Sequence, residues 1–221
     1  MIRKKIKGDL IIISGPSGCG KGSICKEILK MNNNIVLSTS ATTRKPRKGE
    51  IDGIDYYFIS KESFEKKIEM NEFLEFAKVH HDNYYGTLKN KVLDDINKGI
   101  DVILEIDIQG ALQINKTMPE GIFIFIMPPS MKELKRRLIA RNTETKDQII
   151  DRFKKAYQEI NEVSKYNYVV INDNLTDAAK KVESIIQAEK CRVDRIEDFD
   201  LNTKEELLHE LLTVDLKNYK K

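Results

Sequence analysis

The sequence lacks the long apolar stretch that a membrane-spanning helix requires. None of its 221 residues belongs to an unbroken run of the roughly 18 apolar residues that cross a bilayer. The N-terminal residues are basic, but the apolar run behind them, Leu10–Ile13, is too short for a signal peptide. We therefore predict a chain with no membrane span and no cleaved leader.

Cysteine, histidine and excess charge are scarce as well. Cys19, Cys25 and Cys191 are odd in number and form no CxxC pair, which predicts reduced thiols in a cytoplasmic protein. His80 and His81 have no third metal-type ligand nearby in the sequence, so we interpret them as ordinary polar residues. The 38 basic and 35 acidic residues leave a formal net charge of +3, which argues against a nucleic-acid partner.

What the sequence does contain is an alternation of short apolar runs with amphipathic helical patterns. The segment Lys21–Met31 has helical periodicity, and we expect the apolar runs to be buried strands of one parallel sheet covered on both faces. The predicted fold class is α/β, with five strands in the sheet. The five runs are Leu10–Ser14, Ile35–Thr39, Asp101–Asp107, Gly121–Met127 and Tyr168–Ile171.

Three segments depart from this alternation. Residues 40–95 are polar, aromatic and rich in turn residues, whereas residues 130–155 are basic and helical. A capping box, Ser130-Met-Lys-Glu133, predicts that a helix begins there. The tail, residues 196–221, has leucines at helical spacing, which favours a docking helix or the interface of a homodimer.

The strongest motif is Gly15-Pro-Ser-Gly-Cys-Gly20-Lys21, which lies between the first predicted strand and the first predicted helix. Glycines allow successive backbone N–H groups to point at one anion, the helix N-terminus adds partial positive charge, and Lys21 supplies a full one. The alternative, a glycine-rich turn with a surface lysine, explains this placement poorly. The motif therefore predicts a P-loop that binds nucleotide phosphates. Its predicted binding residues are Gly15, Pro16, Ser17, Gly18, Cys19, Gly20, Lys21, Gly22 and Ser23.

Two positions in this loop raise further expectations. The residue after the P-loop lysine is normally Ser or Thr, whose hydroxyl faces Mg²⁺, but here it is Gly22. Mg²⁺ could be held without a loop hydroxyl, Ser23 could reach the metal, or Ser23 could contact the α phosphate instead. Cys19 lies near a helix N-terminus, which predicts enhanced thiolate character, whereas Cys25 is expected to be buried.

The apolar run Asp101–Asp107 ends in two carboxylates. If the run is one strand, Glu105 and Asp107 lie on the same face of it. Ligands of open α/β sheets bind at the carboxyl ends of the strands, so Asp107 is predicted to hold Mg²⁺, directly or through water. A pair of solvent-facing carboxylates is the alternative.

Specific motifs in the polar segment and beyond it give the chain a family resemblance. They are TTRKPRKGEIDGIDYYF, NEFLE, NYYGT, EIDIQG, RNTET and NDNL. On these motifs the chain resembles guanylate kinase, from about Asp9 to Ala188. The resemblance implies transfer of the γ phosphate of ATP to GMP with Mg²⁺, by a P-loop NTPase core carrying an inserted GMP-binding region and a short helical lid.

The resemblance also implies domains and residue roles. Residues 1–39, 96–129 and 156–195 would form the core, 40–95 the GMP-binding insert, 130–155 the lid, and 196–221 a C-terminal helical extension. Arg44, Arg47, Tyr56 and Tyr85 match residues that hold the GMP phosphate. Ser40, Glu75 and Thr87 match those that read guanine, and Glu105 matches an acceptor contact where Asp is common. Lys21, Arg137, Arg141 and Arg152 match the catalytic cations, and Asn172 a residue near adenine.

The chemistry of these residues is consistent with the implied substrate. Guanine presents N1–H and N2–H donors that one carboxylate can accept together, whereas adenine presents a bare N1 acceptor. Two arginines and two phenols suit a phosphate oxyanion. Two other classes stay open at this point: a guanylate-kinase-like interaction domain without activity, and a P-loop NTP hydrolase switch. An intact P-loop argues against the first, and a guanine-reading carboxylate against the second.

Overall fold

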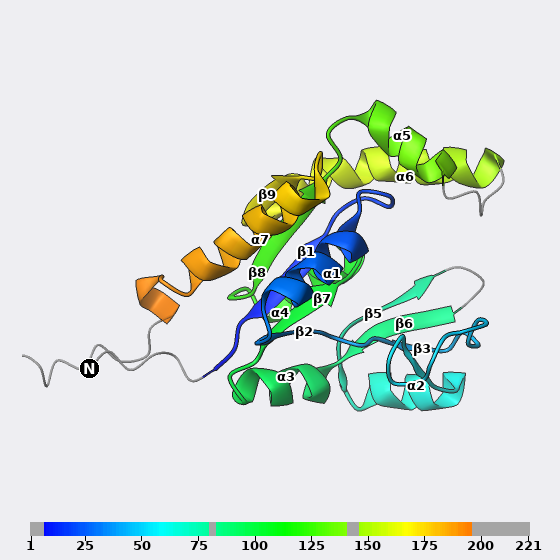
Figure 1. Ribbon diagram of the computed structural model, residues 1–221. Helices are drawn as coiled ribbons and strands as arrows, with labels where there is room; N and C mark the ends of the chain where they lie inside the picture. Colours follow the sequence, from blue (N-terminus) through cyan, green and yellow to red (C-terminus); the bar gives the residue numbers. More distant parts are fainter. Residues whose placement is uncertain (1–6, 80–82, 141–145, 196–221) are drawn as a thin grey trace, which may run out of the picture.

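The computed structural model describes residues 7–79, 83–140 and 146–195, and Figure 1 shows two sheets with helices around them. A five-stranded sheet has the order β2-β7-β1-β8-β9, and all of its neighbouring strands are parallel. Its strands are β1 (Leu10–Ser14), β2 (Ile35–Leu37), β7 (Asp101–Glu105), β8 (Ile122–Met127) and β9 (Tyr168–Ile171). The predicted α/β class and the five-stranded parallel sheet are confirmed.

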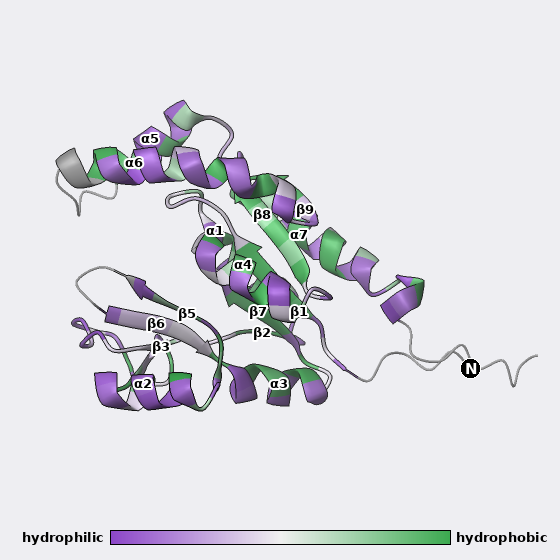
Figure 2. Cartoon of the chain, turned by 180° about the vertical axis from the view of Figure 1, so that it is seen from behind, coloured by the Kyte–Doolittle hydropathy of each residue, from purple (hydrophilic) through white to green (hydrophobic). Residues whose placement is uncertain are grey.

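Helices cover both faces of this sheet because its strands are apolar on both sides. Successive side chains of β1 alternate between two clusters: Ile11 and Ile13 belong to one, and Leu10 and Ile12 to the other. The first cluster includes α1 (Lys21–Met31) and α7 (Leu175–Glu189). The second includes α3 (Lys89–Asn97) and α4 (Ile108–Thr117). Figure 2 shows the result: the central strands are hydrophobic, while the helices are hydrophilic on their outer sides.

A second, four-stranded sheet is built from the polar segment that was predicted to be an insert. Its order is β4-β3-β6-β5, and the long hairpin of β5 and β6 is antiparallel. The strands are β3 (Ala41–Thr42), β4 (Tyr57–Phe58), β5 (Phe73–Val79) and β6 (Asn83–Leu88), and α2 (Lys61–Glu69) packs against them through Phe64. Sequence patterns missed this sheet because two of its strands are only two residues long, too short for an alternating pattern to show.

Two helices form a separate pair where the lid was predicted. They are α5 (Met131–Ala140) and α6 (Lys146–Ile160), and a 3-10 turn, Asn161–Lys165, follows α6. Leu134, Leu138 and Ala156 are buried between them, with Met131 alongside. Ser130 Oγ accepts the Glu133 N–H at 3.1 Å, which confirms the predicted cap. The helix α6 extends five residues beyond residue 155, where we expected the lid to end.

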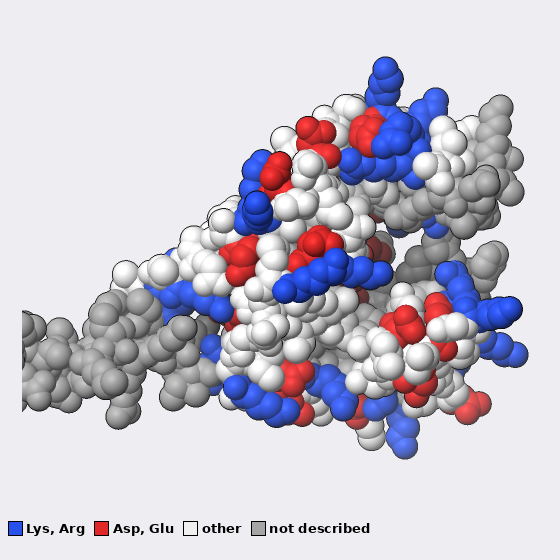
Figure 3. All heavy atoms as spheres, viewed as in Figure 1, with Lys and Arg blue, Asp and Glu red and all other residues white. Residues whose placement is uncertain are grey.

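The second sheet and the α5–α6 pair lie at the same end of the central sheet, on either side of it (Figure 1). On the face shown in Figure 3, acidic and basic side chains are interspersed, and Lys and Arg groups gather where α5 lies. Within the described ranges, no helix is long and apolar enough to cross a membrane. The predicted C-terminal extension, 196–221, lies outside the described residues, and so does the tip between α5 and α6.

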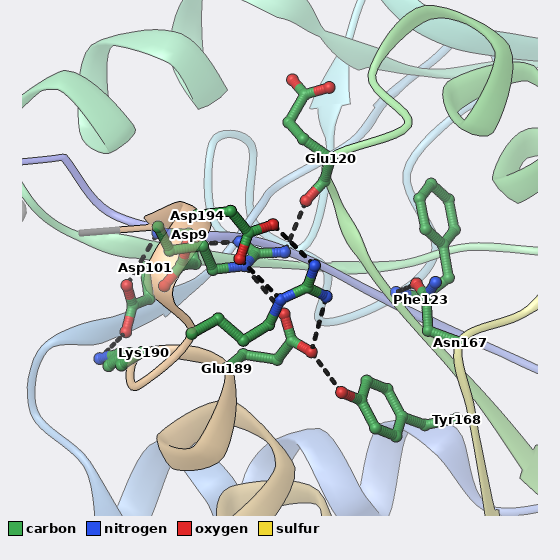
Figure 4. A network of polar contacts seen from close by, with 11 residues as sticks. Asp9, Asp101, Glu120, Phe123, Asn167, Tyr168, Glu189, Lys190 and Asp194 are labelled. Atoms are coloured by element: carbon green, nitrogen blue, oxygen red, sulfur yellow. Dashed lines mark hydrogen bonds and ion pairs between the residues drawn. The ribbon is translucent and has the colours of Figure 1, made fainter. Parts of the chain in front are cut away.

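A buried network of charges stabilises the opposite end of the central sheet, where the parallel strands begin (Figure 4). Arg195, in the short 3-10 turn Val193–Arg195, donates to Asp9 Oδ1 at 2.9 Å and to the Glu120 carbonyl at 2.7 Å. Its Nε lies 2.8 Å from Glu189 Oε2, and Tyr168 donates to the same carboxylate. The network therefore joins the end of α7 to the starts of β1, β8 and β9.

Candidate active site

The phosphate loop connects β1 to α1, as the motif predicted. Gly20 is the residue before α1, and its φ of 96° is a left-handed value that favours glycine. A Cβ at Gly20 would also lie 2.4 Å from the amide nitrogen of Asn172, so no larger residue fits. The loop borders a pocket of about 470 Å³. The lining residues are Ser17, Gly18, Gly20, Lys21, Gly22, Ser23, Lys26 and Glu105.

Two side chains, Lys21 at the start of α1 and Asn172 after β9, support this loop. Lys21 Nζ donates to the carbonyl of Gly15 at 2.6 Å and to that of Pro16 at 3.3 Å, which folds the ammonium over the loop. Asn172, at the end of β9, is buried and donates to the Cys19 carbonyl at 2.7 Å. Its amide thus holds the loop itself, and the contact with adenine that the resemblance implied stays a prediction.

The two cysteines near the loop are both buried. Burial raises the pKa of the Cys19 thiol, and this outweighs the nearby Lys21, which lowers it. The expectation of enhanced thiolate character at Cys19 was therefore wrong, because the side chain is packed in the core and the cost of burying a thiolate exceeds the favourable effect of the Lys21 ammonium and backbone N–H. Cys25 is also fully buried, as predicted.

The acidic end of β7 differs from the prediction in one respect. The strand ends at Glu105, and Asp107 is the N-cap of α4, where its Oδ1 accepts the Gly110 N–H at 2.9 Å. The two carboxylates therefore do not lie on one face of one strand. Glu105 borders both the phosphate-loop pocket and a second pocket, whereas Asp107 borders only the second.

This second pocket, of about 250 Å³, is formed between the two sheets. Most of the residues predicted to contact GMP meet there, although they come from distant parts of the chain. The lining residues are Ser40, Tyr56, Glu75, Ala77, Tyr85, Gly86, Glu105, Ile106 and Asp107. We call it the acceptor pocket. Its neighbour, the phosphate-loop pocket, shares Glu105 with it, so the two pockets are adjacent.

Glu75 is the buried carboxylate of the acceptor pocket. It lies on β5 opposite Thr87 of β6, whose hydroxyl donates to Glu75 Oε1 at 2.7 Å. The side chain is 7% exposed, and this burial, with a smaller contribution from Asp107, raises the pKa of Glu75 to about 7. A buried carboxylate with one oxygen held by a hydroxyl can accept hydrogen bonds from a ligand that presents adjacent donors.

Arg44 lies at the other end of the acceptor region, in contact with the phenol of Tyr85. Its Nε donates to the Tyr85 hydroxyl at 3.2 Å, and its guanidinium lies 5.5 Å from the ring centre of Tyr56. Three of the four residues that were predicted to hold a phosphate therefore contact one another. The fourth, Arg47, has an exposed side chain, and its backbone N–H donates to Glu50.

Glu50 is a site residue that our sequence reasoning missed. Its carboxylate forms a two-pronged ion pair with Arg44, with Oε1 at 2.8 Å from Nη2 and Oε2 at 2.9 Å from Nη1. The guanidinium lowers the pKa of Glu50. Glu50 belongs to the same sequence motif as Arg44, so the sequence did point to it. We assigned it no role because a carboxylate is not expected to bind a phosphate.

Two of the three arginines that were predicted on the lid lie within the described residues. Arg137, on α5, donates to the carbonyl of Asn172 at 3.0 Å and to that of Cys19 at 3.4 Å, so it bridges the lid and the loop. Arg152, on α6, approaches Ser17 Oγ of the loop at 3.4 Å. The lid helices therefore bring two arginines to the phosphate loop, while Arg141 lies outside the described residues.

Comparisons with known proteins agree with this geometry. The guanylate kinase family model matches residues 7–189, which include both pockets and the lid. The chain belongs to the guanylate kinase family. Guanylate kinase of Clostridium tetani is 63% identical over 206 residues, covering 93% of this chain and 98% of that protein. Guanylate kinase of Clostridium perfringens strain SM101 is 55% identical over 211 residues, covering 96% and 97%.

A solved structure shows the same fold. The crystal structure of guanylate kinase from Anaplasma phagocytophilum superposes with a TM-score of 0.72 at 34% identity. The match covers 96% of this chain and all of that one. The two sheets and the lid thus have the arrangement of a guanylate kinase, as the sequence motifs predicted.

Proposed function

We propose that this protein is an ATP:GMP phosphotransferase that makes ADP and GDP. The main observation behind the proposal is the buried carboxylate of Glu75, oriented by the Thr87 hydroxyl, in a pocket next to an intact phosphate loop. A kinase for a guanine nucleotide needs both a base-reading acceptor site and a donor-phosphate site. The relatives named above as guanylate kinases support the same activity.

GMP would bind with its base inside the acceptor pocket. The ionised Glu75 carboxylate accepts N1–H and N2–H of guanine, and the hydroxyl of Ser40, which lines the pocket, is suited to donate to O6. Thr87 would act through Glu75, because its hydroxyl already donates to that carboxylate. The GMP phosphate would then lie near Arg44, Arg47, Tyr56 and Tyr85. Tyr85 accepts a hydrogen bond from Arg44, so its own O–H is available to donate to a phosphate oxygen.

Phosphoryl transfer requires positioning and charge neutralisation rather than a protein base. The acceptor is already a phosphate oxyanion, and Lys21, Arg137 and Arg152 surround the loop on which the donor phosphates would bind. Arg141 is proposed to add a further cation. A lid that closes over the two nucleotides also excludes water, which would otherwise hydrolyse ATP.

The residues of the phosphate-loop pocket fit a magnesium ion bound with the donor nucleotide. Mg²⁺ prefers oxygen ligands, keeps several waters and usually takes one or two carboxylates together with substrate phosphates. Glu105 lines this pocket, and Asp107 follows two residues later. The ion would supply positive charge between the β and γ phosphates. No group of three or more His, Cys, Asp or Glu that could hold a metal occurs in the described part of the chain.

A panel of nucleoside monophosphates tests the proposed function. The protein is incubated with ATP and Mg²⁺ and with GMP, AMP, CMP or UMP, and ADP formation is followed with a coupled assay. We expect ADP formation that depends on GMP and is slow with AMP, CMP and UMP. Equal rates with and without GMP would point to a hydrolase, and no ADP in any mixture to an interaction domain.

The location in the cytoplasm and the homodimer stay predictions.

A further inference from the structure

Gly22 occupies the position at which P-loops normally carry the hydroxyl that faces Mg²⁺. In this structure the carboxylate of Glu105 borders the space beside Gly22. A Cβ built on Gly22 would lie 3.2 Å from Oε1 and 3.2 Å from Oε2 of Glu105, and 3.6 Å from its carboxyl carbon. Such a distance is tighter than ordinary van der Waals contact, so the carboxylate is seated directly against the backbone of Gly22.

The sheet register explains why Glu105 reaches this place. β7 lies beside β1, and Glu105 is paired with Ile13, two residues before the phosphate loop begins at Gly15. The four preceding residues of β7 are buried, whereas Glu105 is exposed at the carboxyl end of the strand. Its backbone is fixed by the ladder, and its side chain extends from there over the first turn of α1.

The size of the residue at each of the two positions, 22 and 105, matters for this contact. Glutamate carries its carboxylate one methylene further from the backbone than aspartate does. Glycine leaves room for that extra reach, whereas a serine at position 22 would place a Cβ in close contact with the carboxylate. The two departures that the sequence shows, a missing loop hydroxyl and a glutamate where aspartate is common, thus meet at one point in space.

We propose that Gly22 and Glu105 form a matched pair, in which the Glu105 carboxylate replaces the missing hydroxyl as the oxygen that faces the donor-site metal. The proposal rests on the proposed function. A carboxylate oxygen is a suitable ligand for Mg²⁺, either directly or through one of its waters. Glu105 also lines the acceptor pocket, so it stands between the donor and acceptor phosphates.

Asp107, the residue first predicted to hold the metal, is placed differently. One of its oxygens caps α4 through the Gly110 N–H, and the residue borders the acceptor pocket but not the phosphate-loop pocket. Asp107→Asn is therefore a matched control for the proposal. It removes a neighbouring negative charge, and asparagine is as good an N-cap as aspartate, so the helix is kept.

The test measures metal binding without turnover. Mn²⁺ replaces Mg²⁺ in the complex of the full chain with ADP, no GMP is added, and electron paramagnetic resonance reports the free Mn²⁺ concentration. Five variants are compared with the unchanged chain: Glu105→Gln, Glu105→Asp, Gly22→Ser, the double variant Gly22→Ser/Glu105→Asp, and the control Asp107→Asn. Circular dichroism melting shows that each variant is folded at the temperature of the measurement.

We expect Glu105→Gln and Glu105→Asp each to weaken Mn²⁺ binding, by a factor within the roughly 2- to 150-fold range that is typical of interactions between groups in direct contact. Asp107→Asn should weaken it less than Glu105→Gln. In the background of Gly22→Ser, the change Glu105→Asp should have little effect, because the new hydroxyl supplies the oxygen and the shorter acid leaves room for it.

Three results would overturn the proposal. The first is an equal loss from Glu105→Asp with and without Gly22→Ser, since independent sites have additive effects. The second is unchanged Mn²⁺ binding in Glu105→Gln, an isosteric change that keeps the fold. The third is a larger loss in Asp107→Asn than in Glu105→Gln. A failure of the proposed kinase function can be told apart from a failure of this proposal, because the monophosphate panel tests the kinase reaction on the unchanged chain.

Discussion

Glu75 and Thr87 face each other across the β5–β6 hairpin, and the Thr87 hydroxyl donates a hydrogen bond of 2.7 Å to Glu75 Oε1. Both residues are buried, and Glu75, which is 7% exposed, lines the acceptor pocket. Because one oxygen is held by the protein, the carboxylate has a fixed orientation toward the ligand.

Glu75→Gln should weaken the use of GMP specifically. The variant keeps the shape but replaces one acceptor oxygen with an NH₂ donor, which leaves a guanine N–H unsatisfied at a cost of about 1–3 kcal/mol. The KM for GMP should rise roughly 5- to 150-fold, while the KM for ATP stays unchanged. Thr87→Ser keeps the hydroxyl and is the matched control, expected within about twofold of the unchanged protein. Unaltered GMP kinetics in Glu75→Gln would refute the guanine-reading role.

The same carboxylate predicts a pH dependence. Burial raises the pKa of Glu75 to about 7, so in the free enzyme a proton binds as the pH falls through 7. Guanine needs the ionised form, because a protonated carboxyl has one acceptor fewer. The KM for GMP should therefore increase as the pH is lowered from 8 to 6, and binding should release protons near pH 7 in isothermal titration calorimetry. A pH profile that is as steep in Glu75→Gln would assign the effect to another group.

Glu50→Gln should weaken the binding of the GMP phosphate but not of the base. Arg44 donates to the Tyr85 hydroxyl, to the Lys45 carbonyl at 2.7 Å and twice to Glu50, which uses four of its five N–H groups and fixes its orientation. We expect GMP affinity to fall roughly five- to tenfold and guanosine affinity to stay constant, both by calorimetry. Glu65→Gln, a surface change on α2, is the control. An equal loss for guanosine would show a general disturbance of the second sheet instead.

Only one thiol should react with a bulky reagent in the native protein. Cys191 is exposed, whereas Cys19 and Cys25 are fully buried. Thiol titration with Ellman's reagent should give one fast group under native conditions and three in denaturant. Mass spectrometry of peptides identifies the modified residue, and the modified protein should keep its activity because Cys191 lies at the far end of α7. Rapid native modification of Cys19 would contradict the buried placement.

Arg195→Met should lower stability without changing kinetics. Arg195 joins Asp9, Glu189 and the Glu120 carbonyl at the edge of the sheet where the strands begin, remote from the nucleotide site (Figure 4). Its removal takes the guanidinium away from the buried Asp9 and Glu189 carboxylates, although Glu189 keeps the more distant Arg192, and this should cost about 2–4 kcal/mol in urea unfolding. Arg192→Met is the control: that side chain is 51% exposed, so a loss under about 1 kcal/mol is expected. A similar small loss in Arg195→Met would show that the network is not stabilising.

Much of the central sheet could be predicted from the sequence because its signals are local. A strand of five residues buried on both faces reads as a continuous apolar run, and the bounds of β1, α1 and β9 agree with the prediction. The P-loop motif depends on glycine positions within one turn, so its geometry also follows from neighbouring residues. The roles of Glu75 and Arg44 came from motifs typical of the family, which identify residues without giving their contacts.

The contacts between distant segments depended on the tertiary structure. The end of β7 looked like one acidic strand, but a helix cap at Asp107 turns the chain and separates the two carboxylates, which periodicity alone does not reveal. The burial of Cys19, the ion pair of Glu50 with Arg44 and the seat of Glu105 against Gly22 also depend on chain packing. By itself, the sequence determined the fold class, the phosphate loop and the family motifs, because these depend on local spacing. Only the tertiary structure decided which carboxylate faces which pocket, because that depends on the register of β7 against β1.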